Sequence, residues 1–231
     1  MSSSSAQGTF ETIGALFDWD GVVIDSARQH ELSWEMLAAE SNLSLPENFF
    51  KRGFGMKNEA IIPDLYKWTT DPELIRTYSL RKEELYRQIL KDDGIEPLPG
   101  VGVFLETLQD AGIPCVVGSS SHRLNIEICL ELFGFTHYFK GIISSENVDK
   151  GKPDPAVFLK AAELVGVPPE RCVVFEDAPV GIEAGLRGGM KVVGVAGTHP
   201  ESTLAGAHRI VRRLDALTVA DLQALWNEEK P

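Results

Sequence analysis

The stretch that decides the fold is FDWDGVVIDS at residues 17–26, which continues an apolar run beginning at residue 13. A short apolar run without proline is typical of a buried strand, and Gly21 supplies the flexible backbone with which such a strand turns away. Asp18 and Asp20 therefore stand at the carboxyl end of the predicted strand. In open α/β sheets ligands bind at that edge, so the pattern predicts a ligand site here.

The two aspartates are close enough to act as one chemical unit. Alternation along an extended chain sends the side chains of Asp18 and Asp20 toward the same side. Two like charges at that separation repel each other unless a cation or a proton lies between them. The alternative is ordinary turn chemistry, because Asp beside Gly is common in turns.

Composition bounds the class of protein. The 231 residues, 43% of them hydrophobic, suffice for one sizeable α/β domain or for one domain that carries a smaller insertion. A formal net charge of −12 argues against nucleic acid and anionic membrane as partners, because both require a basic face. An anionic substrate would therefore need a locally positive pocket.

Cysteine usage and the first residues indicate a cytoplasmic protein. The sequence leaves the oligomeric state open, and a monomer is the default expectation. Cys115, Cys129 and Cys172 are widely spaced, so we expect buried, reduced thiols and a reducing compartment. The Ser-rich start lacks the basic region and apolar core of a signal peptide, and residues 1–9 are expected to form a disordered tail. No run is long enough to span a bilayer.

The order of predicted elements indicates an α/β fold with a Rossmann-like parallel sheet flanked by helices. Beyond residue 96 apolar strands alternate with amphipathic helices, which implies right-handed crossovers between parallel strands. Residues 27–95 look all-helical and read as an inserted cap domain. The core domain then comprises residues 10–26 and 96–231. The further strands are expected at residues 113–117, 141–144, 172–175, 190–195 and 209–211.

Polar clusters follow three of these strands. A serine run occupies residues 119–121, Lys152 follows the next strand, and Glu176 and Asp177 follow the one after that. Each has an ordinary explanation when taken singly: a helix N-cap, a solvated loop charge, or first-turn acids that complement a helix dipole. Because the carboxyl ends of parallel strands share one edge, we expect all three clusters to meet the first two aspartates.

This combination of side chains favours phosphoryl transfer. Four carboxylates together require a hard cation, and Mg²⁺ prefers carboxylate and carbonyl oxygens. Lys152 adds positive charge, while hydroxyls and backbone N–H groups at a helix start form an anion site. We therefore predict Mg²⁺ as the cofactor and a small phosphorylated metabolite as the substrate.

Four short motifs resemble those of the haloacid dehalogenase-like hydrolase superfamily. They are Asp18-Trp19-Asp20-Gly21-Val22, Ser119 after an apolar strand, Lys152 in Gly-Lys-Pro-Asp-Pro, and Phe175-Glu176-Asp177 with Gly181 after it. The match runs from about residue 12 to the last strand, with the motifs in the family's order. The subgroup resembled has a helical cap between the first two motifs and contains β-phosphoglucomutase and many sugar-phosphate phosphatases.

The resemblance implies roles for the core residues. The ionised Asp18 would attack phosphorus and form an aspartyl-phosphate, and Asp20 would protonate the leaving oxygen and then deprotonate the incoming water or hydroxyl. Ser119 and Lys152 would stabilise the equatorial phosphate oxygens. The implied ligands of Mg²⁺ are Asp18, the backbone carbonyl of Asp20, and Asp177, with Glu176 close by.

Substrate contacts are expected from the cap and from the loop after the second motif. His30 matches a hinge-side histidine of β-phosphoglucomutase, although a lone His on a face with Trp34 can equally be a packed core residue. Lys57 stands where β-phosphoglucomutase carries an Arg, so it would bind phosphate as a point charge without the bidentate fork. The expected substrate-binding set is His30, Gly53, Lys57, Ser120, Ser121, His122 and Arg123.

The leading hypothesis is a Mg²⁺-dependent phosphatase of small phosphorylated metabolites such as sugar phosphates. A β-phosphoglucomutase-like isomerase is the alternative among enzymes, although the Lys at position 57 argues against it. A catalytically idle binding or regulatory module is the alternative from a different class. Specificity is expected in cap residues 53–59, with the cap moving about Ser26 and Pro97.

Overall fold

Strand β1 (Gly14–Phe17) is the central element of the structure, and all four of its residues are buried. The computed structural model describes residues 12–53, 56–197 and 199–227, and in it β1 belongs to a six-stranded parallel sheet of order β3-β2-β1-β4-β5-β6. A strand covered on both faces needs a nearly continuous apolar sequence, which β1 has. The tail predicted at residues 1–9 lies outside the described residues.

The other strands lie within two residues of their predicted positions. They are β2 (Cys115–Gly118), β3 (Phe139–Ile143), β4 (Cys172–Glu176), β5 (Lys191–Val195) and β6 (Arg209–Val211). The strand predicted at residues 141–144 starts two residues earlier, because Phe139 is paired with Cys115 in the sheet. The predicted Rossmann-like parallel sheet is confirmed.

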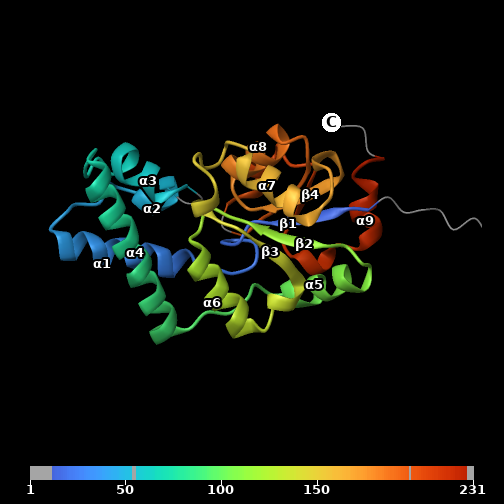
Figure 1. The fold of residues 1–231 in the computed structure, drawn as a ribbon, viewed down its shortest axis with the longest axis horizontal. Helices are drawn as coiled ribbons and strands as arrows, with labels where there is room; N and C mark the ends of the chain where they lie inside the picture. Colours follow the sequence, from blue (N-terminus) through green and yellow to red (C-terminus); the bar gives the residue numbers. More distant parts are fainter. Residues whose placement is uncertain (1–11, 54–55, 198, 228–231) are drawn as a thin grey trace, which may run out of the picture.

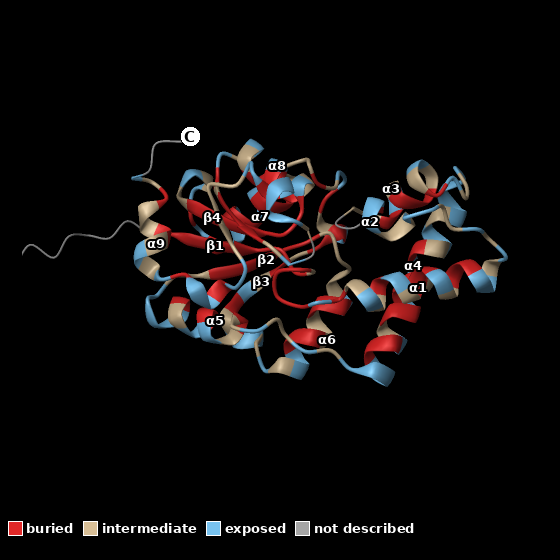
Figure 2. Ribbon diagram, turned by 180° about the vertical axis from the view of Figure 1, so that it is seen from behind, coloured by how far each residue is buried: buried red, intermediate tan, exposed pale blue. Residues whose placement is uncertain are grey.

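Helices cover both faces of the sheet (Figure 1), and the central strands β1, β2 and β4 are buried throughout, whereas the edge strand β6 is only partly buried (Figure 2). Alternation along β1 sends Phe17 to one face, where it stacks on Phe175 at 4.6 Å between ring centres, and Leu16 to the other. The helices of this part of the chain are α5 (Val101–Asp110), α6 (Arg123–Phe133), α7 (Ala156–Val165), α8 (Pro179–Arg187) and α9 (Val219–Ala224).

The chain between β1 and α5 forms an all-helical insertion, which lies beside the sheet in Figure 1. Its elements are α1 (Ala27–Ser41), α2 (Phe49–Gly53), α3 (Asn58–Ala60), a π-helical turn (Ile61–Leu65) and α4 (Pro72–Asp93). Trp34, Ile62 and Leu85 belong to a separate hydrophobic cluster that holds these helices together. None of the described helices combines the length and apolar character needed to cross a membrane.

The chain passes between the sheet and the insertion twice, at two segments that lie side by side. Ile24 forms an isolated antiparallel bridge with Pro97, and the N–H of Leu98 donates to the carbonyl of Val23 at 2.8 Å. Hinges are formed by a few residues at the ends of elements, and these two adjacent crossings are such residues. The arrangement is compatible with the predicted movement of the insertion about Ser26 and Pro97, which stays a prediction.

Packing on the sheet predicts the stability of two neighbouring variants. Phe104 is buried against Phe17 and Phe175, whereas the adjacent Val103 is 61% exposed. Phe104→Ala should lower the free energy of unfolding by about 3–5 kcal/mol, because it leaves a cavity in the core. Val103→Ala, the control, should change it by less than about 0.5 kcal/mol. Urea unfolding of both variants measures the difference, and equal effects would contradict this assignment of the helix faces.

Candidate active site

The register of the strands brings the ends of β1, β2 and β4 to the same edge of the sheet. Phe17 lies opposite Val117 on β2 and Phe175 on β4. The N–H of Asp18 donates to the carbonyl of Phe175 at 3.0 Å, which fixes the backbone where β1 ends. The residues that follow these three strands are therefore delivered to one place.

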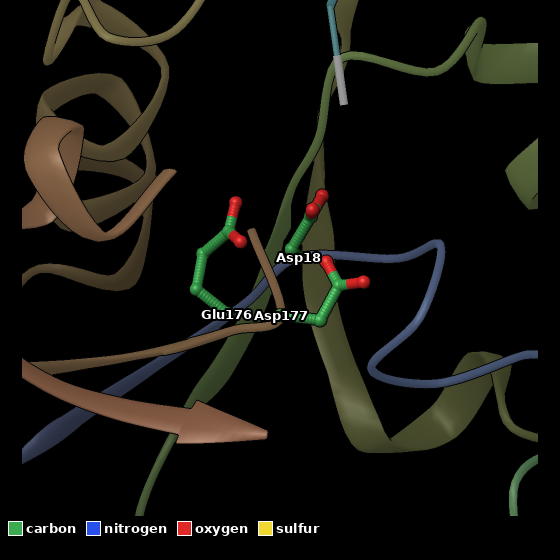
Figure 3. Close-up of side chains that lie close together, drawn as sticks. All are labelled: Asp18, Glu176 and Asp177. Atoms are coloured by element: carbon green, nitrogen blue, oxygen red, sulfur yellow. The ribbon is translucent and has the colours of Figure 1, made fainter. Parts of the chain in front are cut away.

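Three buried carboxylates form a cluster at this edge. Oxygens of Asp18, Glu176 and Asp177 all lie within 4.8 Å of one another (Figure 3). Oxygen donors gathered this closely suit a hard divalent cation, and such a cation would offset their mutual repulsion. The residues present therefore fit Mg²⁺, the cofactor predicted from the sequence.

Lys152 supplies a buried positive charge beside the cluster. Its Nζ lies 2.6 Å from Oε1 of Glu176 and 3.0 Å from Oδ1 of Asp18. Burial by itself lowers the pKa of Lys152, but the two carboxylates outweigh burial and raise that pKa above its ordinary value. Burial also raises the pKa of Glu176, with Asp18 adding to the effect and Lys152 opposing it. The Lys152 ammonium therefore stays charged.

Glu176 is held in position from two sides. Its Oε1 receives the hydrogen bond of Lys152, and its Oε2 accepts the N–H of Ala178 at 2.7 Å. A Cβ atom added to Gly181 on α8 would lie 1.6 Å from Oε1 of Glu176. Only glycine leaves room for the carboxylate at that position, which explains a glycine within the helix after the acidic pair.

The carboxylate of Asp20 has different partners and is not part of the acidic cluster. It accepts hydrogen bonds from the hydroxyls of Ser26 and Ser121, and its Oδ1 lies 3.1 Å from Nε2 of His30. Burial would raise the pKa of Asp20, but these contacts together lower it well below its ordinary value. Asp20 is therefore ionised and oriented; the metal contact expected of its backbone carbonyl stays a prediction.

The serine run lies next to both aspartates. Ser119 is buried, its N–H donates to the carbonyl of Ile143 at 2.9 Å, and its Oγ accepts the N–H of Ser121 at 3.1 Å. The first bond joins the residue after β2 to the end of β3, and the second lies within the serine run. The run at residues 119–121 lines the same pocket as Asp18 and Asp20.

This pocket lies between the edge of the sheet and the helical insertion, and residues of both line it. Polar side chains line the sheet side, whereas Trp34, Ile61 and Tyr66 contribute an apolar wall from the insertion. Two of the cap residues predicted to contact substrate, His30 and Gly53, are also in the lining.

His30 connects Asp20 to two charged residues of α4. Its Nδ1 lies 2.6 Å from Nζ of Lys82, and its ring stacks on Tyr86 with 4.1 Å between ring centres. Lys82 in turn donates to Oε1 of Glu83 at 3.0 Å. Both α4 residues are buried and line the pocket.

Lys82 and Glu83 are absent from the set predicted from the sequence. Because α4 is rich in Lys, Arg and Glu, its charged side chains are expected to lie in solvent, and this composition gives no reason to single out Lys82 and Glu83. A signal was nevertheless present, because Lys82, Tyr86 and Ile89 are spaced four and three residues apart and share the buried face of α4.

Three residues predicted to contact substrate have other partners in the structure. Lys57 donates to the backbone carbonyls of Ser145 and Val148, at 2.8 Å in both cases. His122 lies 3.6 Å from Glu146, and the guanidinium of Arg123 donates to the carbonyl of Ile142 at 2.7 Å and to Glu127 at 3.3 Å. Lys57, His122 and Arg123 are not in the lining of the pocket in the part of the chain that the structure describes.

Comparison with known proteins gives relatives of two kinds. The chain is 39% identical over 216 residues to the chloroplastic 5-amino-6-(5-phospho-D-ribitylamino)uracil phosphatase of Arabidopsis thaliana, which covers 92% of the chain but only 57% of that longer relative. It is 30% identical over 222 residues to a β-phosphoglucomutase of Bacillus subtilis, with 92% of the chain and 95% of that protein covered.

Structural comparison and the match to a family model indicate the same family. A solved structure from Entamoeba histolytica, described as a HAD hydrolase of family IA, variant 3, superposes with a TM-score of 0.84 at 28% identity, covering 94% of this chain and all of that one (100%). The family model for haloacid dehalogenase-like hydrolases matches residues 14–189, which include all four motifs. The chain belongs to the haloacid dehalogenase-like hydrolase family.

Proposed function

We propose that this protein is a Mg²⁺-dependent phosphatase of small phosphorylated metabolites that works through an aspartyl-phosphate on Asp18. The observation that carries the proposal is the position of Asp18. Its carboxylate belongs to a buried acidic cluster, is paired with Lys152 at 3.0 Å, and lines a pocket beside Asp20. A nucleophile, a countercharge and a second carboxylate for proton transfer are therefore adjacent.

Two carboxylates divide the chemistry between them. In the first step Asp20 starts protonated: Asp18 attacks phosphorus, the bond to the leaving oxygen breaks, and Asp20 gives its proton to that oxygen and becomes ionised. In the second step Asp20 accepts a proton from water, the water oxygen attacks phosphorus, and inorganic phosphate leaves Asp18. The ionised Asp20, oriented by His30 and two hydroxyls, is the form needed for the second step.

Charge stabilisation comes from the residues around Asp18. Lys152 and Ser119 would bind the equatorial phosphate oxygens, where charge spreads in the transition state. Asp18 and Asp177 would hold Mg²⁺ together with the backbone carbonyl of Asp20, and Glu176 would lie beside them. When bound, the metal supplies positive charge that offsets the repulsion between the nucleophile and the phosphate.

The substrate is proposed to be a sugar phosphate or a related polyol phosphate. The 39% identical relative is named as a phosphatase of a compound that carries a phosphorylated ribityl chain. His30, Gly53, Ser120 and Ser121 are proposed to contact the substrate, since all four line the pocket.

The remaining predicted contacts would need a change of partners. Lys57 would bind substrate only by exchanging its two carbonyl partners for substrate oxygens. His122 and Arg123 would likewise leave Glu146 and Glu127.

A phosphomutase is the second candidate, because a β-phosphoglucomutase is among the relatives that cover nearly the whole chain. Such an enzyme would interconvert hexose 1- and 6-phosphates faster than it releases phosphate. Product analysis with glucose 1-phosphate and a trace of glucose 1,6-bisphosphate distinguishes the two reactions.

We also propose a monomer in a reducing compartment such as the cytoplasm. Cys115, Cys129 and Cys172 are buried free thiols, as a reducing environment requires. The net charge of −12 is consistent with a small-molecule substrate and not with nucleic acid.

Removing the nucleophile tests the mechanism. Asp18→Asn should reduce the release of phosphate from p-nitrophenyl phosphate at least about a thousandfold, since loss of a nucleophile removes the covalent route. Asp110→Asn, an equivalent change at an exposed position on α5, is the control and should retain full turnover. Turnover by the Asp18 variant at the control rate would refute the nucleophile assignment.

Metal binding should be visible without any turnover. A saturating concentration of Mg²⁺, about 100 times its dissociation constant, should stabilise the protein by about 2.7 kcal/mol, equivalent to a rise in Tm of about 5–10 °C. Removing the metal with EDTA should reverse the rise and abolish phosphate release. Asp177→Asn should show little Mg²⁺-dependent rise; a full rise in that variant would exclude Asp177 as a ligand.

The space around Glu176 gives a third test. Gly181→Ala should displace the Glu176 carboxylate and lower phosphate release about 10- to 100-fold, as changes beside metal ligands commonly do. The control is Gly206→Ala, where the added Cβ would meet Ile182 at 3.4 Å in ordinary contact. Initial rates at several Mg²⁺ concentrations measure the effect; identical rates for both variants would show that the fit at Gly181 is unimportant.

A further inference from the structure

The insertion side of the pocket carries a buried acid, Glu83, that the reaction steps above do not use. Its Oε1 accepts hydrogen bonds from Asn58 at 2.7 Å and Lys82 at 3.0 Å, and its Oε2 accepts from Asn125 at 2.5 Å. Burial would raise the pKa of Glu83, but Lys82 and the other partners lower it to about 2. Glu83 therefore places an ionised carboxylate in the pocket lining on the side of the insertion.

The positive charge on this side is already engaged. Lys82 is the one Lys or Arg among the described residues that line the pocket. It is paired with Glu83, lies 2.6 Å from His30, and its Nζ is 5.6 Å from the ring centre of Trp34 and 5.3 Å from that of Tyr86. The Lys82 ammonium is therefore not free to pair with a second anionic group.

The next candidate cation is directed elsewhere. Lys57 donates to the carbonyls of Ser145 and Val148 in the loop after β3. The side chain of Lys57 also packs on Gly151, where an added Cβ would lie 2.8 Å from its Cγ. Of the Lys and Arg residues that the structure describes, only Lys82 lines the pocket, and Glu83 and His30 hold it.

We propose that Glu83 is a specificity-determining residue that selects substrates with one phosphate and an uncharged, hydroxyl-bearing far end, such as a polyol monophosphate. This inference rests on the proposed phosphatase function. A hydroxyl can donate to the Glu83 carboxylate and approach the apolar wall without charge. A second phosphate, which carries about −1.5 to −2 charges at pH 7, would face that carboxylate without a free cation to offset the repulsion.

The same arrangement distinguishes hydrolysis from phosphomutase chemistry. A mutase must hold a sugar bisphosphate with either phosphate at the nucleophile, so its pocket needs a cationic group at the far end. Here that position holds an acid and an engaged lysine. The pocket therefore favours release of phosphate from a monophosphate over exchange through a bisphosphate.

Competition against a small reporter substrate tests the inference. With p-nitrophenyl phosphate as the reporter, hexitol 1-phosphate should inhibit with a Ki at least about a hundredfold lower than that of hexitol 1,6-bisphosphate. Both compounds carry the same reacting phosphate, so the ratio of the two Ki values reports the far end alone. Equal inhibition, stronger inhibition by the bisphosphate, or no inhibition by either compound overturns the inference and leaves the phosphatase proposal intact.

Two variants show whether Glu83 causes the discrimination. Glu83→Gln keeps the size of the side chain and should reduce the ratio of Ki values about tenfold or more. Glu84→Gln, at a position 56% exposed on the same helix, should leave that ratio unchanged. An unchanged ratio in folded Glu83→Gln overturns the assignment. If Glu83→Gln does not show a cooperative thermal transition, the ratio of Ki values measured on the wild-type protein decides whether the inference holds. If the wild-type protein does not hydrolyse the reporter at all, both this inference and the phosphatase proposal are refuted.

Discussion

The pairing of Lys152 with Asp18 and Glu176 is the interaction on which the site depends. Three carboxylates are buried within 4.8 Å of one another at the end of a rigid sheet, and the ammonium of Lys152 lies 3.0 and 2.6 Å from two of them. Removing one partner from a buried ion pair costs about 3–5 kcal/mol, because an uncompensated charge remains. Burying these charges costs free energy, and the same charges are those that the proposed phosphoryl transfer would use.

A second set of polar contacts links the helical insertion to the sheet domain across the pocket. Glu83 of α4 accepts from Asn125 of α6, and Lys57 reaches two carbonyls of the loop after β3. These contacts and the bridge between Ile24 and Pro97 hold the insertion over the strand ends. The proposed substrate contact at Glu83 therefore coincides with a contact that joins the insertion to the sheet domain.

Much of the fold and the acidic part of the site could be predicted from the sequence. The six strands were located within two residues, and Asp18, Lys152, Glu176 and Asp177 lie together as strand ends in a parallel sheet must. The cap side was harder to predict. Lys82 was missed in a helix rich in charged residues, and Lys57 has backbone partners that no local pattern indicates.

The sequence by itself determined the elements and their order, because a period of two or of 3.6 residues and short polar clusters are local properties of the chain. Those elements in turn determined that Asp18 and Asp20 share an edge with Glu176. Only the tertiary structure decided which charged side chains enter the pocket. That choice depends on how α4 is rotated against α1 and the sheet, and such packing buried Lys82 and Glu83 while leaving Glu84 in solvent.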